Sequence, residues 1–302
     1  MIQAENVVKT FEGFRALDGL NIHVPKGAIY GLVGPNGAGK STFIRHLAGI
    51  YRQDSGTVQI DGQDVFENPA VKSRIAYIPD DIPFFLQAGV RDMMRFYSGI
   101  YPGFDKARYE KLKLVFAIDE RQPMRKLSKG MQKQAAFWLA LSMRPDVLIL
   151  DEPVDGLDPV MRRQVWSLLM GDVAENGTTV LVSSHNLREL EDVCDNICLL
   201  HSGGVIADSD VDNLKLNLTK VHLIFEDEAL IETVKEQLNV IKLNQKGKIY
   251  ELTLRGNREE IVAYLNSLNP VFIELLSLSL VEVFINEMEV SGYEIHSILA
   301  DS

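Results

Sequence analysis

Cysteine is nearly absent from this 302-residue chain, which has only Cys194 and Cys198. Two cysteines cannot build a disulfide scaffold, and their spacing where a helix runs into a strand predicts reduced core thiols rather than a redox or metal pair. Long hydrophobic runs are also missing, since the longest, such as 147–150, are far shorter than the roughly 20 residues that cross a bilayer. We therefore do not expect the chain to span a membrane by itself.

Basic residues are outnumbered, with 31 lysines and arginines against 42 acids and a net charge of −11. This balance disfavours a nucleic-acid partner, because binding to a phosphate backbone needs positive charge. The opening residues, MIQAENVVKTF, lack the basic start and the apolar stretch of a secretory signal. We therefore expect a cytoplasmic globular protein of two domains, or of one domain with a large appendage.

Apolar strand-like runs alternate with helix-like segments over the first two hundred residues, which predicts an α/β domain with a parallel sheet. Three runs rich in Val, Ile and Leu predict strands that are buried on both faces: 28–33, 147–150 and 179–183. The stretch of about 85–143 has helical spacing instead. We interpret it as a helical insertion.

The composition changes after about residue 207, and we expect a domain boundary near Ser209. Residues 209–302 hold 16 acidic and 8 basic residues. Their pattern predicts strands at 221–227, 240–243, 249–254 and 271–275, with helices at 229–238 and 259–268. This is the β-α-β-β-α-β order of a small ferredoxin-like α+β domain. The predicted domains are therefore 1–208 and 209–302.

The strongest local motif is GPNGAGKST at 34–42, which fits the pattern G-x-x-x-x-G-K-[ST] between a predicted strand and a predicted helix. Its glycines permit a tight loop whose amides point at phosphate oxygens, and the following helix adds positive potential. Lys40 is expected to reach the β- and γ-phosphates, and Ser41 is expected to ligate Mg²⁺. The motif therefore predicts a nucleoside triphosphate site.

Three polar residues follow two of the predicted buried strands. Because the carboxyl ends of parallel strands meet at one edge, Asp151 should face the same crevice as Lys40 and serve as a Mg²⁺ partner. Glu152 is placed to orient or deprotonate an attacking water. His185, at the end of the strand predicted at 179–183, could bind the γ-phosphate or that water.

The segment LSKGM, at 127–131, is not explained within one chain. Ser128 and Gly130 open a helix whose predicted inner face includes Ala135 and Trp138, so its free amides form an anion site. Yet the phosphate loop already occupies the nucleotide crevice of this chain.

Together, these motifs resemble the ATP-binding cassette of ABC transporters, in unbroken order over about 1–208. The phosphate loop, the LSGGQ-like signature, the LILDEP strand, the D-loop at 156–158 and the switch histidine all have counterparts. The resemblance implies a P-loop NTPase cassette that binds ATP and Mg²⁺. The implied ATP-binding residues are Phe11, which would stack on adenine although Phe14 competes, and Gly34, Pro35, Asn36, Gly37, Ala38, Gly39, Lys40, Ser41 and Thr42.

The resemblance also implies how the protein works. Two cassettes, identical or homologous, would pair head to tail, so that Ser128, Lys129, Gly130 and Met131 of one close on the ATP of the other. Asp158 would belong to the D-loop, and Glu152, His185 and Lys40 would carry catalysis. An integral membrane subunit would convert the cycle into transport, most simply export, at the cytoplasmic face of the membrane. The alternatives are a soluble cassette ATPase and a regulatory nucleotide-binding module.

Two departures from the family pattern stand out. Asp80 and Asp81 occupy the place of the usual glutamine after the strand at 75–78, so that Asp80 is a further candidate metal ligand. The signature has Lys129 and Met131, a variation that resembles cassettes of bacterial export systems. We expect four residues of the insertion either to dock the membrane subunit or to fill the insertion's own core: Phe84, Phe85, Met93 and Met94.

Overall fold

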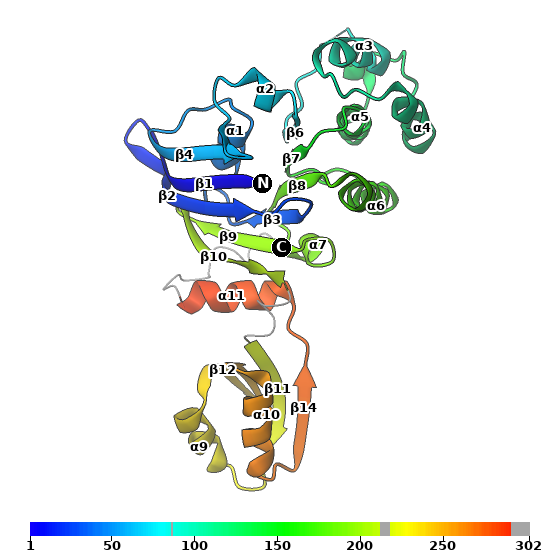
Figure 1. Ribbon diagram of the computed structural model, residues 1–302. Coiled ribbons are helices and arrows are strands. Elements are labelled where there is room, and N and C mark those ends of the chain that lie inside the picture. Colours follow the sequence, from blue (N-terminus) through cyan, green and yellow to red (C-terminus); the bar gives the residue numbers. More distant parts are fainter. Residues whose placement is uncertain (86, 212–217, 291–302) are drawn as a thin grey trace. The chain divides into compact units, whose positions relative to one another are not determined.

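A computed structural model describes residues 1–85, 87–211 and 218–290 (Figure 1). Contacts divide them into two units, and the first consists of Met1–Asn186 and Val193–Asp208. The second consists of Leu187–Asp192 and the described residues from Ser209 onward. The short segment that follows Asn186 therefore groups with the second unit, although the first unit precedes and follows it in the chain.

Two sheets form the first unit (Figure 1). An antiparallel sheet has the order β2-β1-β4-β5, and a six-stranded sheet has the order β10-β9-β3-β8-β7-β6. The strands are β1 (Ile2–Phe11), β2 (Phe14–Val24), β3 (Ile29–Val33), β4 (Ser55–Ile60), β5 (Gln63–Asp64), β6 (Ile75–Ile78), β7 (Val147–Asp151), β8 (Thr179–Ser184), β9 (Asn196–His201) and β10 (Gly204–Asp210). The predicted buried strands are confirmed as β3, β7 and β8.

The helices of the first unit include the predicted insertion. They are α1 (Lys40–Leu47), α2 (Pro69–Lys72), α3 (Val90–Ile100), α4 (Lys106–Phe116), η1 (Met124–Lys126), α5 (Lys129–Ser142) and α6 (Pro159–Asn176). Those from α3 to α5 lie between β6 and β7 in the chain, which confirms helices across about 85–143. Ala135 and Trp138 on α5 are fully buried, so the expected inner face of this helix is also confirmed.

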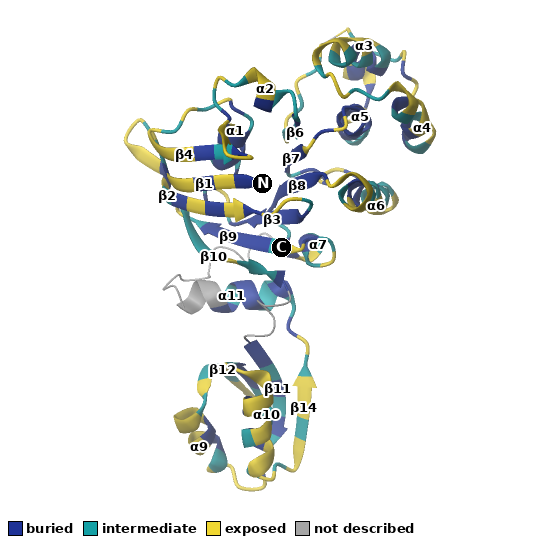
Figure 2. Cartoon of the chain, in the orientation of Figure 1, coloured by how far each residue is buried: buried dark blue, intermediate teal, exposed yellow. Residues whose placement is uncertain are grey.

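Pairing of the parallel strands brings their carboxyl ends to one edge. Val33 of β3 pairs with Ser184 of β8, and Asp151 of β7 pairs with Ser183. These strands are buried along their whole length (Figure 2). Apolar residues of β1, β2, β4, α1 and the six-stranded sheet share one core. This core fixes the edge at which the candidate site lies.

Both cysteines are buried and free, as the sequence predicts. Burial raises the pKa of both thiols, which keeps them protonated. They are therefore apolar core residues and supply no chemistry to the site.

The second unit contains a four-stranded antiparallel sheet with the order β12-β13-β11-β14 (Figure 1). Its elements are α7 (Leu187–Glu191), β11 (Leu218–Ile224), α9 (Leu230–Gln237), β12 (Asn239–Lys246), β13 (Ile249–Arg255), α10 (Arg258–Ser267), β14 (Phe272–Leu276) and α11 (Leu280–Val290). From β11 to β14 the order is β-α-β-β-α-β, as the sequence predicts. Helices α7 and α11 contact each other, and Leu190 and Leu280 are buried.

Candidate active site

The phosphate loop lies between β3 and α1, where the motif requires it. Gly39 has a φ of +107°, a backbone conformation that residues with a Cβ rarely adopt. A Cβ added to Gly34 would lie 2.3 Å from the carbonyl oxygen of Leu200. No side chain caps α1, whose Ncap residue is Gly39. The first amides of this helix are therefore free to bind an anion.

Lys40 is buried, with 6% of its surface exposed. Its ammonium donates hydrogen bonds to the carbonyl oxygens of Gly34, at 2.6 Å, and Pro35, at 3.3 Å. Burial lowers the pKa of Lys40, although the charges of Glu152 and Asp151 oppose this shift. The loop itself thus holds the ammonium in place through two of its own carbonyl oxygens.

The expected metal ligands meet at the carboxyl edge of the sheet. The hydroxyl of Ser41 lies 3.3 Å from Oδ1 of Asp151, and the same oxygen accepts a 2.5 Å hydrogen bond from the hydroxyl of Ser183. Hydroxyl and carboxylate oxygens are the ligands that Mg²⁺ prefers in proteins. Ser183, which the sequence analysis did not single out, fixes the orientation of the carboxylate.

Glu152 and His185 lie side by side beyond the ends of β7 and β8. Nδ1 of His185 lies 3.0 Å from Oε2 of Glu152. Burial raises the pKa of Glu152, against the lowering effects of His185 and Lys40. A carboxylate with a raised pKa is better suited to accept a proton from water. Asp155 joins the pair within 4.8 Å, and the sequence analysis missed it.

The signature residues form the start of α5. Ser128 is the Ncap residue, and its exposed hydroxyl accepts a 3.3 Å hydrogen bond from the amide of Met131. Gly130 packs against the D-loop, where a Cβ would lie 2.7 Å from the carbonyl oxygen of Gly156. Asp158 caps α6 by accepting 3.0 Å hydrogen bonds from two amides. The signature helix and the D-loop are therefore in direct contact within one chain.

Phe11 ends β1 and pairs with Phe14 across the turn to β2. The ring of Phe11 packs edge-on against Tyr51, with 5.3 Å between ring centroids, whereas Phe14 is 65% exposed. Both rings lie at the same end of the hairpin, but Phe11 is packed against a neighbouring ring whereas Phe14 is mostly exposed.

Asp80 lies beyond β6 and pairs with a residue that the sequence analysis missed. Its Oδ1 lies 3.2 Å from the ammonium of Lys133 on α5, which also donates to the carbonyl oxygen of Glu152 at 2.7 Å. No sequence signal singles out Lys133, because it lies two residues before Ala135 and so projects from the side of the helix opposite the predicted inner face. Asp81 is exposed at the same turn.

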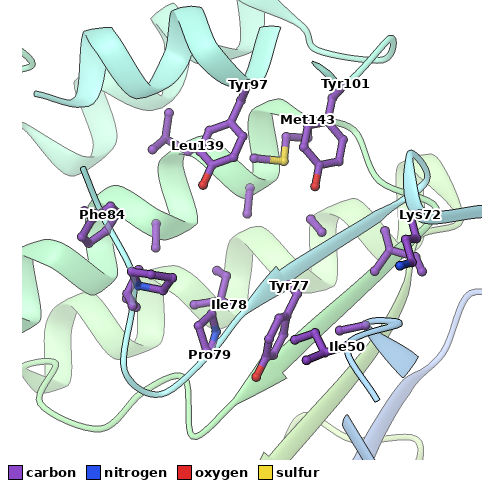
Figure 3. Close-up of a pocket in the computed structure, with 17 residues that line it drawn as sticks. Ile50, Lys72, Tyr77, Ile78, Pro79, Phe84, Tyr97, Tyr101, Leu139 and Met143 are labelled. Atoms are coloured by element: carbon purple, nitrogen blue, oxygen red, sulfur yellow. The ribbon is translucent and has the colours of Figure 1, made fainter. Parts of the chain in front are cut away.

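A pocket of about 400 Å³ opens between the end of β6 and the insertion (Figure 3). Tyr97 of α3 and Tyr101, which follows α3, point into it, and Tyr77 of β6 lines the opposite side (Figure 3). Burial raises the pKa of Tyr77 to about 12, so its hydroxyl stays neutral. The other lining residues are mostly apolar and include Ile50, Phe84, Leu139 and Met143.

Four insertion residues were expected to dock a partner or to fill the insertion's core. Met93 is only 2% exposed and belongs to the core, whereas Phe85 is 57% exposed and Phe84 lines the pocket. Met94 is half-buried. The exposed side of α3 also carries Phe96 and Ile100, which the sequence analysis did not name. Among the described residues, none of the helices has the length and apolar character that a membrane crossing requires.

Comparisons with known proteins identify the family of this chain. The sequence model of the ABC transporter family matches residues 17–155. The chain is 34% identical over 285 residues to the ABC transporter ATP-binding protein YtrB of Bacillus subtilis (strain 168), which covers 94% of this chain and 97% of YtrB. It is also 34% identical over 228 residues to the daunorubicin/doxorubicin resistance ATP-binding protein DrrA of Streptomyces peucetius, over 72% of this chain and 67% of DrrA.

A solved structure described as the ATP binding subunit of an ABC transporter has the same fold. It matches with a TM-score of 0.67 and 27% identity, over 71% of this chain and 92% of that chain. The relationship to YtrB extends along nearly the full length of both proteins. The chain therefore belongs to the ATP-binding proteins of ABC transporters, and it is an ATPase whose hydrolysis of ATP drives transport.

Proposed function

We propose that ATP binds at the phosphate loop with Mg²⁺ held by Ser41 and Asp151. The 3.3 Å approach of these two oxygen donors supports this assignment. Mg²⁺ would neutralise charge on the β- and γ-phosphates. Lys40 would release the carbonyl of Gly34 and bind the same phosphates. Phe11 would stack on the adenine, and its edge-on contact with Tyr51 would hold the ring in position.

Glu152 acts as the general base in this proposal. A water between its carboxylate and the γ-phosphorus would lose a proton to Oε1 or Oε2 as its oxygen attacks phosphorus. The bond from the γ-phosphorus to the β–γ bridging oxygen then breaks, which yields ADP and phosphate. His185 holds the Glu152 carboxylate through the 3.0 Å contact and faces the departing phosphate. The contact between Glu152 and His185 is the observation that carries this function.

Two cassettes would share each ATP. Ser128 and Lys129 are exposed at the start of α5, whose first amides have no partner within the helix. An exposed helix start of this kind attracts an anion, and a second chain can supply the triphosphate. Because Gly130 and Gly156 are in close contact, a movement of the D-loop would also shift the signature helix of the same chain. ATP binding would close the pair, and hydrolysis would open it.

The membrane subunit would dock at the pocket beside β6. Phe85 and Phe96 are the chain neighbours of two pocket-lining residues, Phe84 and Tyr97. Their exposed rings are in edge-on contact, with centroids 5.2 Å apart. An exposed aromatic pair beside an apolar pocket suits a helix with apolar anchors. The protein would therefore act at the cytoplasmic face of the membrane, bound to its partner.

The direction proposed is export. DrrA is named for resistance to daunorubicin and doxorubicin, and another relative, BcrA of Enterococcus faecalis, is named for bacitracin transport at 32% identity. These names support an amphipathic small molecule or peptide as cargo. A soluble cassette ATPase and a regulatory module are not favoured, because the relatives are transporter ATP-binding proteins and the catalytic carboxylates are all present.

The Glu152→Gln variant tests this proposal. It should bind ATP with Mg²⁺ but hydrolyse it at least about a hundredfold more slowly, and it should accumulate as an ATP-dependent dimer in size-exclusion chromatography. The matched control is Glu175→Gln, because Glu175 is an exposed glutamate at the end of α6. Wild-type hydrolysis by Glu152→Gln would refute the role of the base. The partner is sought by co-purification from detergent-solubilised membranes and mass spectrometry.

A further inference from the structure

The backbone amide and carbonyl of Glu152 are both held by hydrogen bonds to residues of two other elements, Ser183 of β8 and Lys133 of α5. Its amide donates to the carbonyl oxygen and to the hydroxyl of Ser183, both at 3.2 Å. Its carbonyl oxygen accepts a 2.7 Å hydrogen bond from Lys133. Between these anchors Glu152 has a φ of +46°, in the left-handed region that a side chain with a Cβ disfavours. Such a conformation persists only where the surroundings enforce it.

Lys133 is itself deeply placed, with 6% of its surface exposed. A buried ammonium is unfavourable unless a counter-charge and hydrogen-bond acceptors surround it. Asp80 supplies the charge, with its carboxylate 3.2 Å away and 63% exposed, and the carbonyl of Glu152 supplies an acceptor. The two contacts together explain how a lysine can occupy this position.

The pairing of β6 with β7 brings Asp80 and Glu152 to the same edge of the sheet. Ile78 of β6 pairs with Leu150 of β7, so Asp80 and Glu152 each lie two residues beyond paired strand positions. The ammonium of Lys133 contacts both chain segments from α5. The same helix also touches the chain beyond β7 through Gly130 and Gly156. The signature helix therefore contacts the segment after β7 at two points, and one of them is the backbone carbonyl of Glu152.

We propose that Lys133 is a positioning residue for ATP hydrolysis, with Asp80 as its counter-ion. By fixing the carbonyl of Glu152, Lys133 holds the backbone in the conformation that aims the carboxylate at the attacking water. Asp80, in the place of the family's usual glutamine, then serves the base through Lys133 rather than through the metal. This inference rests on the proposed role of Glu152 as the base.

The first test is Lys133→Met, which keeps the length of the side chain and removes its donor. Misplacing a catalytic group by about an ångström can cost as much as a hundredfold in rate. We expect kcat to fall about 10–100-fold while KM for ATP stays within about twofold, because Lys133 lies outside the phosphate loop. Lys133→Arg, which keeps a cationic donor, should recover most of kcat. The matched control is Lys72→Met, because Lys72 also donates to a backbone carbonyl, that of Gly49, at 2.9 Å.

A second test does not depend on the folding of a Lys133 variant. Asp80→Asn changes an exposed side chain and removes the counter-ion, and it should lower kcat several-fold with KM unchanged.

A third test combines two substitutions. In a Glu152→Gln background, Lys133→Met should slow single-turnover hydrolysis by less than about twofold, since its effect passes through Glu152. An equal loss in both backgrounds, or a rise in KM with kcat unchanged, would overturn the proposal.

The two proposals fail in different ways. If Glu152→Gln hydrolyses ATP at the wild-type rate, the base is another group and the role of Glu152 is wrong. If Glu152→Gln is inactive but Lys133→Met has the wild-type kcat, the base stands and only the positioning role of Lys133 is wrong.

Discussion

Gly130 of the signature helix packs so closely on Gly156 of the D-loop that an added Cβ would lie 2.7 Å from the carbonyl oxygen of Gly156. Backbone lies on both sides of this contact, so no flexible side chain can move aside. Any side chain at position 130 must shift the helix start or the loop. Both segments belong to the proposed interface between cassettes.

Gly130→Ala should therefore lower ATP hydrolysis about tenfold or more, because the signature amides would no longer meet the triphosphate of the partner cassette. ATP affinity of the separate chain should not change. The measurements are steady-state hydrolysis and equilibrium nucleotide binding. The control is Gly171→Ala in α6, where an added Cβ has nothing within 4 Å and should raise the free energy of unfolding by about 0.5–1 kcal/mol. Unchanged hydrolysis in Gly130→Ala would contradict the proposed interface.

Lys40→Met should weaken ATP binding about 10–100-fold, because the charge-assisted contacts to the phosphates are lost. The thermal midpoint should not fall, since the buried ammonium is already disfavoured by desolvation. Titration with a fluorescent ATP analogue measures the first effect, and calorimetry measures the second. Lys26→Met, at an exposed turn, is the control. Wild-type affinity in Lys40→Met would show that ATP binds elsewhere.

Glu120 joins three donors in the insertion: Arg91, Lys113 and Tyr109. Burial alone would raise the pKa of this carboxyl, but the three donors outweigh it and lower the pKa from 4.5 to about 2. A lowered pKa means that the ionised network stabilises the fold above about pH 4.5, and that this stability is lost as the pH falls toward 2.

Glu120→Gln should accordingly lower the free energy of unfolding by about 1–3 kcal/mol at pH 7. The gap between wild type and variant should shrink as the pH falls below 4.5, where the wild-type carboxyl of the unfolded chain takes up its proton. Urea unfolding at pH 7, 4.5 and 3 measures the gap, and the exposed Glu110→Gln on α4 is the control. A gap independent of pH would show that the charge of Glu120 is unimportant.

Phe85→Ser should reduce co-purification with the membrane subunit without changing ATP hydrolysis by the separate chain. Phe85 is 57% exposed, follows the pocket-lining Phe84 in the chain and contacts Phe96. Its loss would remove an apolar anchor from the proposed interface. Leu114→Ser is the control, because Leu114 is 83% exposed on α4 and does not line the pocket. Equal co-purification of both variants with wild type would place the partner on another surface.

Much of the site follows from local sequence because strand ends determine it. A parallel pairing that sets Asp151 beside Ser183 also brings Ser41, Glu152 and His185 to one edge, and uninterrupted apolar runs reveal such strands directly. Glycine positions such as Gly39 follow in the same way, since a tight phosphate loop needs positive φ.

Contacts between distant segments could not be predicted in this way. Lys133 reads as a solvated helix residue, and only the packing of α5 over the ends of β6 and β7 brings it to Asp80 and Glu152. Met93 has the same helical spacing as residues of an exposed face, yet it is buried within the insertion. Helical periodicity gives a face, but it does not say what covers that face.

The grouping of α7 with the second unit has a consequence for synthesis of the chain. Helix α7 begins two residues after His185, and its packing partner α11 begins at Leu280. The carboxylate of Glu191 accepts a 3.2 Å hydrogen bond from the amide of Leu280. A nascent chain cannot complete this contact before Leu280 has left the ribosome. The segment that follows His185 therefore reaches its final surroundings only after about 90 further residues have been synthesised.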